Sequence, residues 1–475
     1  MAKGWGAFPQ VNVMAFGAQG NGIHDDWGAI QAAINAVPDA GGTVAIPYGT
    51  FLISDALTIT KQKVSIVGQG IGTILQATNL TKDMFLLGDG NVTYADLALR
   101  HMKLTASGQK TSNSGIKLNK CFKVWLDGLF VEKQYRALHI LNSTQVWITN
   151  CPIRDTKENG ITIEAAINNG YDWYINNVVM DNPDVTNAGI GIQWLGGETL
   201  VMSGADIMRF VTGMDIDAAN GKEARWGFFT NVILDTCSDN GLHVGNTGTG
   251  NVAGLTFTNC WTSTNTNYGV LIDKNGTGYV EGIRFIGHKA MNNGLAGFRL
   301  AGGEDLHVLA SDVVSNSATV SNTRHGVEVT TTTDWSVQGC RITNGYGHGA
   351  SQANGINVDA GAADNYMILN NDLRGNANSA MSNGATGTTR KIANNLGYVT
   401  ENRGSSSIDS GQTTKQVAHG LSVTPNQINI TFKEQGTSDY GRWWVSGVDG
   451  TNLTLNVSAD PGASNLDFDW QAIFV

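Results

Sequence analysis

A short pattern of the form Gly-apolar-x-Ile, with Val or Leu sometimes replacing Ile, recurs along most of the chain and constrains its fold more than any other feature. It reads GIKL at 115, GITI at 160, GIGI at 189, GMDI at 213, GLHV at 241, GVLI at 269, GFRL at 297, GVEV at 326 and GINV at 355, and ALHI at 137 fits with Ala in place of Gly. Successive starts lie 22 to 29 residues apart, and each unit holds two further short apolar segments. Three short strands per repeat, stacked in register, make a parallel β-helix. The sequence therefore predicts an all-β protein, built as a right-handed single-stranded parallel β-helix.

The start of the chain is expected to close one end of this stack, whose exposed strand edges need a cover. Asp25 and Asp26 can N-cap a helix over 27–37, which carries an apolar stripe on one side. We therefore predict an N-terminal cap with a helix over residues 1–40 and the β-helix itself over 41–400.

The end of the chain has a different pattern. The polar, Ser- and Gly-rich segment 401–414 is predicted to be a linker, and 415–475 a small antiparallel, β-sandwich-like module. Alternation can bury only about half of its large apolar side chains, which are Trp443, Trp444, Phe468, Trp470, Ile473 and Phe474. QVAHGLSVTPNQINITF with the closing DFDWQAIFV resembles the C-terminal β-modules of many phage tail proteins, which implies trimeric assembly. A homotrimer is therefore expected; the alternative is that the module packs on the last coil of the β-helix.

Composition limits the partners. Only 15% of residues are charged and the formal net charge is −10, which argues against nucleic acid or an anionic membrane as a partner. No apolar run reaches the roughly 18 residues that span a bilayer, and no signal peptide is visible. An extracellular or virion-associated location is nevertheless expected, reached by another route such as cell lysis. The five cysteines are expected to be buried and reduced. No Cys/His set has zinc spacing. We expect no cofactor, with calcium left open by Asp-rich turns.

Alternate residues of a strand point to opposite faces, so the repeat also predicts which side chains line its outer surface. The first outward column is expected to read Lys117, His139, Thr162, Gly191, Asp215, His243, Leu271, Arg299, Glu328 and Asn357. The second is expected to read Asn119, Leu141, Glu164, Gln193, Asp217, Gly245, Asp273, Ala301, Thr330 and Asp359. The acids concentrate in the middle of this face. They are either a solvated surface or, in part, catalytic.

Crowding of like charges favours the catalytic interpretation. Asp215 and Asp217 lie two residues apart on one face, about 6.6 Å along a strand, so repulsion should raise one pKa. Glu164 and Asp273 are expected two coils away on either side, at about 9.6 Å. Glycosidases need two carboxyl groups, about 5–5.5 Å apart for retention or about 6.5–9.5 Å apart for inversion of the sugar's configuration, and both outcomes stay open here. These four residues are the catalytic candidates. The substrate-binding candidates are His243, Gln193, Trp194, Trp226, Arg299 and Glu328.

One further resemblance narrows the fold. FGAQGNGIHDDWGAIQAAINAV followed by GGTVAIPYGTFLI resembles the opening of the pectate-lyase-like β-helix superfamily, with Asn21 where Asp is usual and Phe51 where Tyr is usual. This resemblance implies the fold without fixing the activity, because the superfamily includes lyases, polygalacturonases, epimerases and phage tailspike depolymerases. The YGHG segment at 346–349 is superficially similar to the GHG of polygalacturonases, but that family's neighbouring signatures are missing.

The favoured function is a polysaccharide depolymerase, most simply a glycoside hydrolase that uses paired carboxylates on the outer face. Because the central face is acidic and its expected cations, Lys117 and Arg299, lie at least two coils from Asp215, a neutral or mixed-charge glycan is favoured over a polyanion. The alternatives are a polysaccharide lyase on the same fold and a non-catalytic glycan-binding tail or adhesion fibre.

Overall fold

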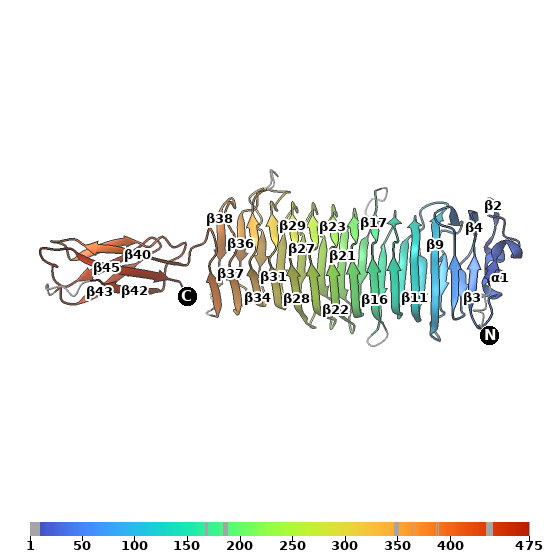
Figure 1. The fold of residues 1–475 in the computed structure, drawn as a ribbon, viewed down its shortest axis with the longest axis horizontal. Helices are drawn as coiled ribbons and strands as arrows, with labels where there is room; N and C mark the ends of the chain where they lie inside the picture. Colours follow the sequence, from blue (N-terminus) through green and yellow to red (C-terminus); the bar gives the residue numbers. More distant parts are fainter. Residues whose placement is uncertain are drawn as a thin grey trace, which may run out of the picture.

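The computed structural model describes residues 10–166, 170–183, 189–345, 351–362, 364–385, 387, 389–433 and 440–474. In these residues the chain forms a long rod of stacked parallel strands with a small β domain beyond its C-terminal end (Figure 1). The prediction of an all-β protein with a parallel β-helix is confirmed.

The Gly-start strands all lie in one sheet, which we call the glycine-start sheet. Its thirteen strands in the described residues are β5 (Leu57–Ile59), β8 (Phe85–Leu87), β10 (Ser114–Asn119), β12 (Arg136–Leu141), β15 (Ile161–Glu164), β18 (Ile190–Trp194), β21 (Thr212–Ala218), β24 (Leu242–Asn246), β27 (Val270–Asp273), β30 (Phe298–Ala301), β33 (Val327–Val329), β36 (Asn354–Val358) and β38 (Ser379–Asn383). Neighbours pair in parallel and in register, as where Leu242 lies opposite Val270.

Two further ladders complete each coil. The second ladder contains β1 (Gln10–Asn12), β3 (Gly42–Ala45), β6 (Val64–Val67), β13 (Thr144–Thr149), β16 (Tyr171–Asn176), β19 (Gly197–Ser203), β22 (Glu223–Thr230), β25 (Asn251–Thr258), β28 (Val280–Ile286), β31 (Glu304–Leu309), β34 (Thr333–Gln338), β37 (Tyr366–Leu369) and β39 (Arg390–Ala393). The third contains β2 (Asn21–Asp25), β4 (Gly49–Ile53), β7 (Thr73–Ala77), β14 (Ile153–Arg154), β17 (Val179–Asp181), β20 (Asp206–Met208), β23 (Ile233–Asp235), β26 (Trp261–Ser263), β29 (Lys289–Met291), β32 (Asp312–Val314) and β35 (Arg341–Thr343). The long strands β9 (Tyr94–Ala106) and β11 (Cys121–Glu132) run through both ladders and join them.

Inward side chains from the three ladders stack on one another along the axis. Phe229, Phe257 and Phe285 form one such column, with ring centroids 4.5 and 4.9 Å apart. The five cysteines are buried and free. Burial raises their pKa to about 12 for Cys121, Cys151, Cys237 and Cys340 and to about 11 for Cys260. The thiols are therefore protonated core residues.

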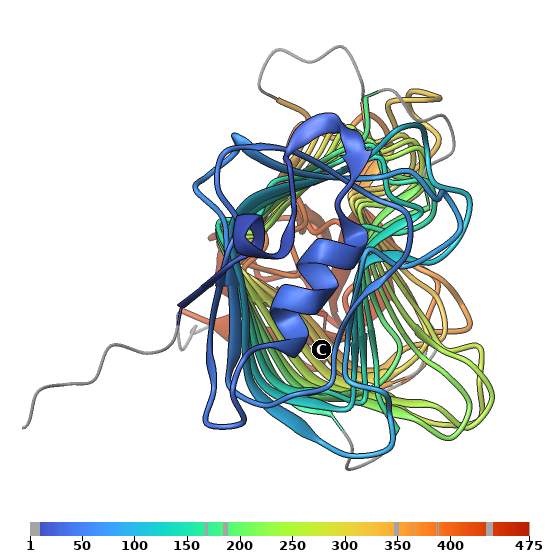
Figure 2. The same ribbon diagram turned by 90° about the vertical axis from the view of Figure 1, so that its right-hand side faces the viewer.

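Helix α1 (Trp27–Asn35) lies across the N-terminal end of the coil, as the view along the axis shows (Figure 2). Its Ile30, Ala33 and Ile34 are buried against the first coil. The 3-10 helix η1 (Val13–Phe16) precedes it. Asp25 caps the helix, because its side chain accepts a hydrogen bond from the backbone N–H of Trp27 at 3.2 Å.

The expectation that Asp26 also caps the helix is wrong. The Asp26 side chain makes no cap hydrogen bond. Its carboxylate instead accepts hydrogen bonds from the backbone N–H groups of Gln19, at 2.7 Å, and Gly20, at 3.1 Å. Because Asp26 is fully buried, these two donors compensate for the loss of water around its charge.

The segment 401–414, predicted to be a linker, is largely folded, and that prediction is wrong. Residues Glu401–Ile408 form β40, which pairs along its whole length with β45 (Leu466–Ile473). The outer face of this strand is polar and exposed, and Ile408 is buried in the domain core. Its Ser-rich composition therefore reflects a solvated sheet face.

The C-terminal domain is built from two three-stranded sheets. One contains β40, β45 and β42 (Gln427–Phe432), and the other β41 (Thr414–Ala418), β44 (Asn452–Val457) and β43 (Trp443–Val448). Phe468 and Trp470 lie in the core between them, whereas Trp443 and Trp444 are 46% and 47% exposed. Phe474 packs against the β-helix core.

Candidate functional site

The outer face of the glycine-start sheet brings several predicted residues into one column. Gln193 of β18, Asp215 of β21 and His243 of β24 lie opposite one another in successive coils. The column continues through Leu271, Arg299 and Glu328.

The expectation that Gly191 stands in this column is wrong, because Gln193 occupies that place. The motif GIGI contains two glycines, and the structure puts the second at the glycine-start position. A Cβ at Gly160 would meet the backbone oxygen of Gly191, and a Cβ at Gly191 that of Gly213. The strand register therefore shifts by two residues in this one coil relative to the sequence-based alignment.

His243 bridges two carboxylates from the coils on either side of it. Its Nδ1 lies 2.7 Å from Asp215 Oδ1 and its Nε2 lies 2.9 Å from Asp273 Oδ1. Burial lowers the pKa of His243, but the hydrogen bonds to Asp215 and Asp273 and their charges outweigh burial and raise it to about 10. The imidazole is therefore protonated at neutral pH and donates to both carboxylates.

The absence of a side chain at Gly245 leaves space for the hydrogen bonds of His243. It lies opposite Asp217, two residues after His243, and a Cβ there would stand 2.7 Å from Asp273 Oδ1 and 3.0 Å from His243 Cε1. Any side chain at this position would push the histidine and the carboxylate apart.

The carboxyl groups around His243 differ in acidity. The pKa of Asp217 is raised by burial and by the charge of Asp215. Burial also raises the pKa of Asp273, but the hydrogen bond from His243 outweighs it and the net shift is downward. Thr247 Oγ1 donates to Asp217 at 3.1 Å. The site thus pairs a carboxyl that holds its proton to higher pH with a carboxylate that stays ionised, as acid–base catalysis requires.

Glu164 is held in an ion pair that the sequence did not suggest. Lys222, in the turn after β21, places Nζ 2.7 Å from Glu164 Oε1, and His139 Nε2 lies 3.5 Å from Oε2. The hydrogen bonds from His139 and Lys222 outweigh burial and lower the pKa of Glu164 to about 2. Glu164 therefore carries no proton to donate near neutral pH.

Arg299 and Glu328 form a second ion pair on this face, with Nη1 and Oε2 2.9 Å apart. Glu328 is 3% exposed, so the expectation that it binds substrate is wrong, because its carboxylate is shielded and serves to hold the guanidinium. Arg299 also lies over the Tyr268 ring and helps to lower the pKa of Asp273.

The structure separates the two predicted tryptophans from this cluster. Trp194 is fully buried, so the expectation that it stacks on a sugar is wrong. Alternation places it inward, opposite Ile163 and Ile216, with its ring edge-on to Trp173. Its neighbour Gln193 faces outward and accepts a hydrogen bond from Asn159 at 2.9 Å.

Trp226 lies on β22 of the second ladder, so it is on a different sheet from the carboxylates. Half of its side chain is exposed. The YGHG segment at 346–349 lies outside the described residues.

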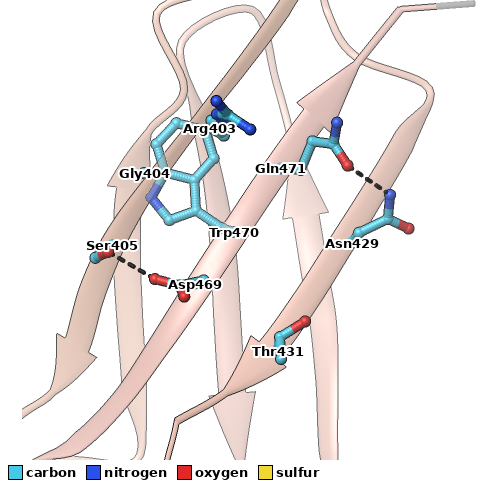
Figure 3. Close-up of a pocket in the computed structure, with 8 residues that line it drawn as sticks. All are labelled: Arg403, Gly404, Ser405, Asn429, Thr431, Asp469, Trp470 and Gln471. Atoms are coloured by element: carbon cyan, nitrogen blue, oxygen red, sulfur yellow. Dashed lines mark hydrogen bonds between the residues drawn. The ribbon is translucent and has the colours of Figure 1, made fainter.

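A separate cavity of about 450 Å³ lies in the C-terminal domain, over the sheet of β40, β45 and β42 (Figure 3). Its polar side chains bond one another, as Ser405 does to Asp469 at 2.6 Å and Asn429 to Gln471 at 3.2 Å. The hydrogen bond from Ser405, helped by Lys433, lowers the pKa of Asp469. This cavity therefore lacks the proton donor that the glycine-start sheet provides.

Within the described ranges, no group of three or more His, Cys, Asp or Glu side chains has the arrangement of a metal site. No helix in that part of the chain is long and apolar enough to cross a membrane.

Comparison with known sequences finds a family match for the first half of the chain. Residues 10–237 match the family described as Rhamnogalacturonase A/epimerase, pectate lyase-like. Alginate lyase 7 of Azotobacter vinelandii is 39% identical over 114 residues, which make up 22% of this chain and 12% of that protein. Mannuronan C5-epimerase AlgE1 of the same organism is 38% identical over 115 residues, or 22% of this chain and 7% of its own length. The match thus spans only a small part of these relatives.

Solved structures share the fold over more of the chain. The A-module of mannuronan C-5 epimerase AlgE6 from Azotobacter vinelandii superposes with a TM-score of 0.58 at 18% identity, covering 81% of this chain and 98% of that one. The Dettilon tailspike protein superposes with a TM-score of 0.57 at 13% identity, covering 98% and 94%. At these identities the likeness establishes the fold alone.

Proposed function

We propose that this pectate-lyase-like right-handed β-helix protein binds a polysaccharide along the outer face of the glycine-start sheet and cleaves it there. The observation that carries the proposal is the raised pKa of Asp217 beside the Asp215–His243–Asp273 bridge. The names of the sequence relatives, which include a lyase and epimerases of polysaccharides, support a carbohydrate polymer as the substrate.

The favoured reaction is hydrolysis of a glycosidic bond. Asp217 donates its proton to the oxygen of the departing sugar, because its pKa is raised and it retains that proton to higher pH. An ionised carboxylate is needed as the partner. Asp273, whose pKa is raised by burial but lowered overall by the hydrogen bond from His243, supplies it, and His243 fixes its orientation together with that of Asp215 through two hydrogen bonds. That carboxylate takes up the proton lost by the attacking water.

A lyase or epimerase reaction is the second candidate, and Lys222 is the observation that favours it. The sequence-based preference against a polyanion assumed an acidic central face, but Lys222 and protonated His243 place positive charge among the acids. Cations next to a uronate carboxylate neutralise it and ease removal of the neighbouring carbon-bound proton. Alginate lyase and mannuronan epimerase names among the relatives point the same way.

The products distinguish the reactions. Wild-type protein is incubated with a panel of neutral and uronate polysaccharides, and both reducing ends and ultraviolet absorbance are followed. New reducing ends without absorbance support hydrolysis, whereas absorbance from an unsaturated product supports a lyase. Neither signal, but a changed ratio of the two C5-epimeric uronates in the recovered polymer, supports an epimerase. Saturable binding with neither signal and an unchanged uronate composition overturns the enzymatic proposal in favour of a glycan-binding fibre.

We also propose that the protein is a homotrimer held together by its C-terminal domain, and that it acts outside the cell or on a virion, as the name of the Dettilon tailspike suggests. Trp443 and Trp444, nearly half exposed on β43 at the edge of its sheet, are the surface that a second copy would cover.

A further inference from the structure

A groove of about 570 Å³ lies on the second ladder, on a different sheet from the candidate catalytic carboxylates. Its position follows from one column of residues, Trp226, Gly254 and Gly282, in three successive coils. All three have left-handed backbone, with φ of 63°, 68° and 66°. A bulky side chain rarely adopts this conformation, whereas glycine does so freely.

The two glycines leave a hollow beside the indole. A Cβ at Gly254 would stand 2.6 Å from Cε3 and 2.8 Å from Cζ3 of Trp226, so the ring extends from its own coil over the next one. Gly282 has no side chain to fill the same position in the following coil. One coil later the side chain of Asp305 occupies this position and closes the hollow. Two coil spacings amount to about 9.6 Å. The indole is 50% exposed, so it offers an apolar wall to whatever occupies this space.

The remaining walls are polar and mostly acidic. Glu281 and Glu304 lie opposite one another on one side. Arg284 lies on the other, paired with Asp305 at 2.9 Å. With Asp334 the groove has four carboxyl groups and one guanidinium. This charge repels a polyanion, while carboxylate oxygens accept hydrogen bonds from hydroxyl groups.

We propose that this groove is a second, non-catalytic binding site for a neutral saccharide. The indole packs against the apolar face of a sugar ring, and the carboxylates accept hydrogen bonds from its hydroxyl groups. The site lies on the face next to the candidate catalytic one, since the chain passes from β21 to β22 through the turn 219–222. It goes beyond the proposed cleavage and does not depend on it.

The test uses Trp226→Gly, which removes the indole and places at 226 the residue type found at 254 and 282 in the same column. The backbone conformation there suits glycine, so the variant should keep its thermal unfolding temperature. Phe228→Ala is the matched control, because Phe228 lies on the same strand and is 47% exposed but does not line the groove. Retardation of each protein is measured in native gels containing dextran, galactomannan, xyloglucan or alginate.

We expect at least one of the three neutral polymers to retard the wild-type protein, and Trp226→Gly to weaken the apparent Kd roughly fivefold or more. Phe228→Ala should behave as wild type. The proposal is overturned if no neutral polymer binds, if alginate alone binds, if Trp226→Gly binds as wild type, or if Phe228→Ala loses as much. Failure of the wild-type protein to cleave any polymer leaves this result unchanged, because the groove lies on another sheet and the test measures binding alone.

Discussion

His243 Nδ1 lies 2.7 Å from Oδ1 of Asp215, one coil away. The same ring reaches Asp273 with its other nitrogen, so a single imidazolium ties three successive coils together. The positive charge on His243 should make the free energy of unfolding depend on pH, and this dependence can be measured.

Replacing His243 by Gln should destabilise the protein in a pH-dependent way. The folded pKa of His243 is raised to about 10 from the ordinary 6.5, so its stabilising effect is complete below pH 6.5 and disappears as pH rises through about 10. We expect the variant to lose about 1–3 kcal/mol at pH 6 through the broken charged hydrogen bonds. Thermal unfolding of both proteins from pH 6 to 10.5 checks this. A gap that stays constant with pH would contradict the assigned charge.

Replacing Glu164 by Gln tests the contribution of its ion pair with Lys222 to stability, here through the dependence at acidic pH. The folded pKa of Glu164 is lowered to about 2, so its contribution is complete above pH 4.5 and is lost as pH falls through about 2. The variant should therefore unfold at a lower temperature than wild type at pH 6, and the two should converge near pH 2. Equal unfolding temperatures at pH 6 would show that the ion pair contributes nothing.

Gly245→Ala should disturb the bridge by volume alone. The added Cβ would lie 2.7 Å from Asp273 Oδ1, so we expect a loss of about 1–3 kcal/mol from overpacking. Gly108→Ala is the control, because its Cβ would meet only Leu80 at 3.6 Å. Chemical denaturation of both variants checks this, and equal stability of the two would refute the close fit.

Much of this site could be read from the sequence. The repeat of glycine and alternating apolar residues predicts the sheet, and alternation within it puts Asp215 and Asp217 on its outer face. It also brings His243 beside them. The ion pair between Lys222 and Glu164 was not predicted. Lys222 belongs to a turn, and the periodicity of the strands does not determine the direction of a turn; its partner Glu164 lies 58 residues away in the sequence.

The errors in the sequence-based picture have local causes. Gln193 was assigned to the wrong outward column because GIGI contains two glycines, and the sequence alone does not show which of them takes the glycine-start position. The close packing of Gly191 against Gly213 identifies it as the second. Trp194 was expected outside because aromatic residues suit sugars, but the alternation that faces Gln193 outward turns Trp194 into the core. Strand β40 was mistaken for a linker because one of its faces is solvated and rich in serine.

The assembly prediction rests on the exposed tryptophans of β43. The double variant Trp443→Ser, Trp444→Ser should be a monomer where the wild type is a trimer. The two substitutions remove the exposed apolar surface that we propose another copy covers. Light scattering on both proteins measures the mass. A monomeric wild type, or a double variant that remains trimeric, would disprove this interface.

The rate of cleavage by Asp217→Asn tests the central claim most directly. The amide cannot donate the proton, so we predict a fall of about 10²–10⁴ in the release of reducing ends from the polymer that the panel identifies. The unfolding temperature should be retained. Asp359→Asn, at an exposed position further along the same face, should cleave as wild type. Cleavage by Asp217→Asn within about threefold of wild type would contradict the assignment of Asp217 as the proton donor.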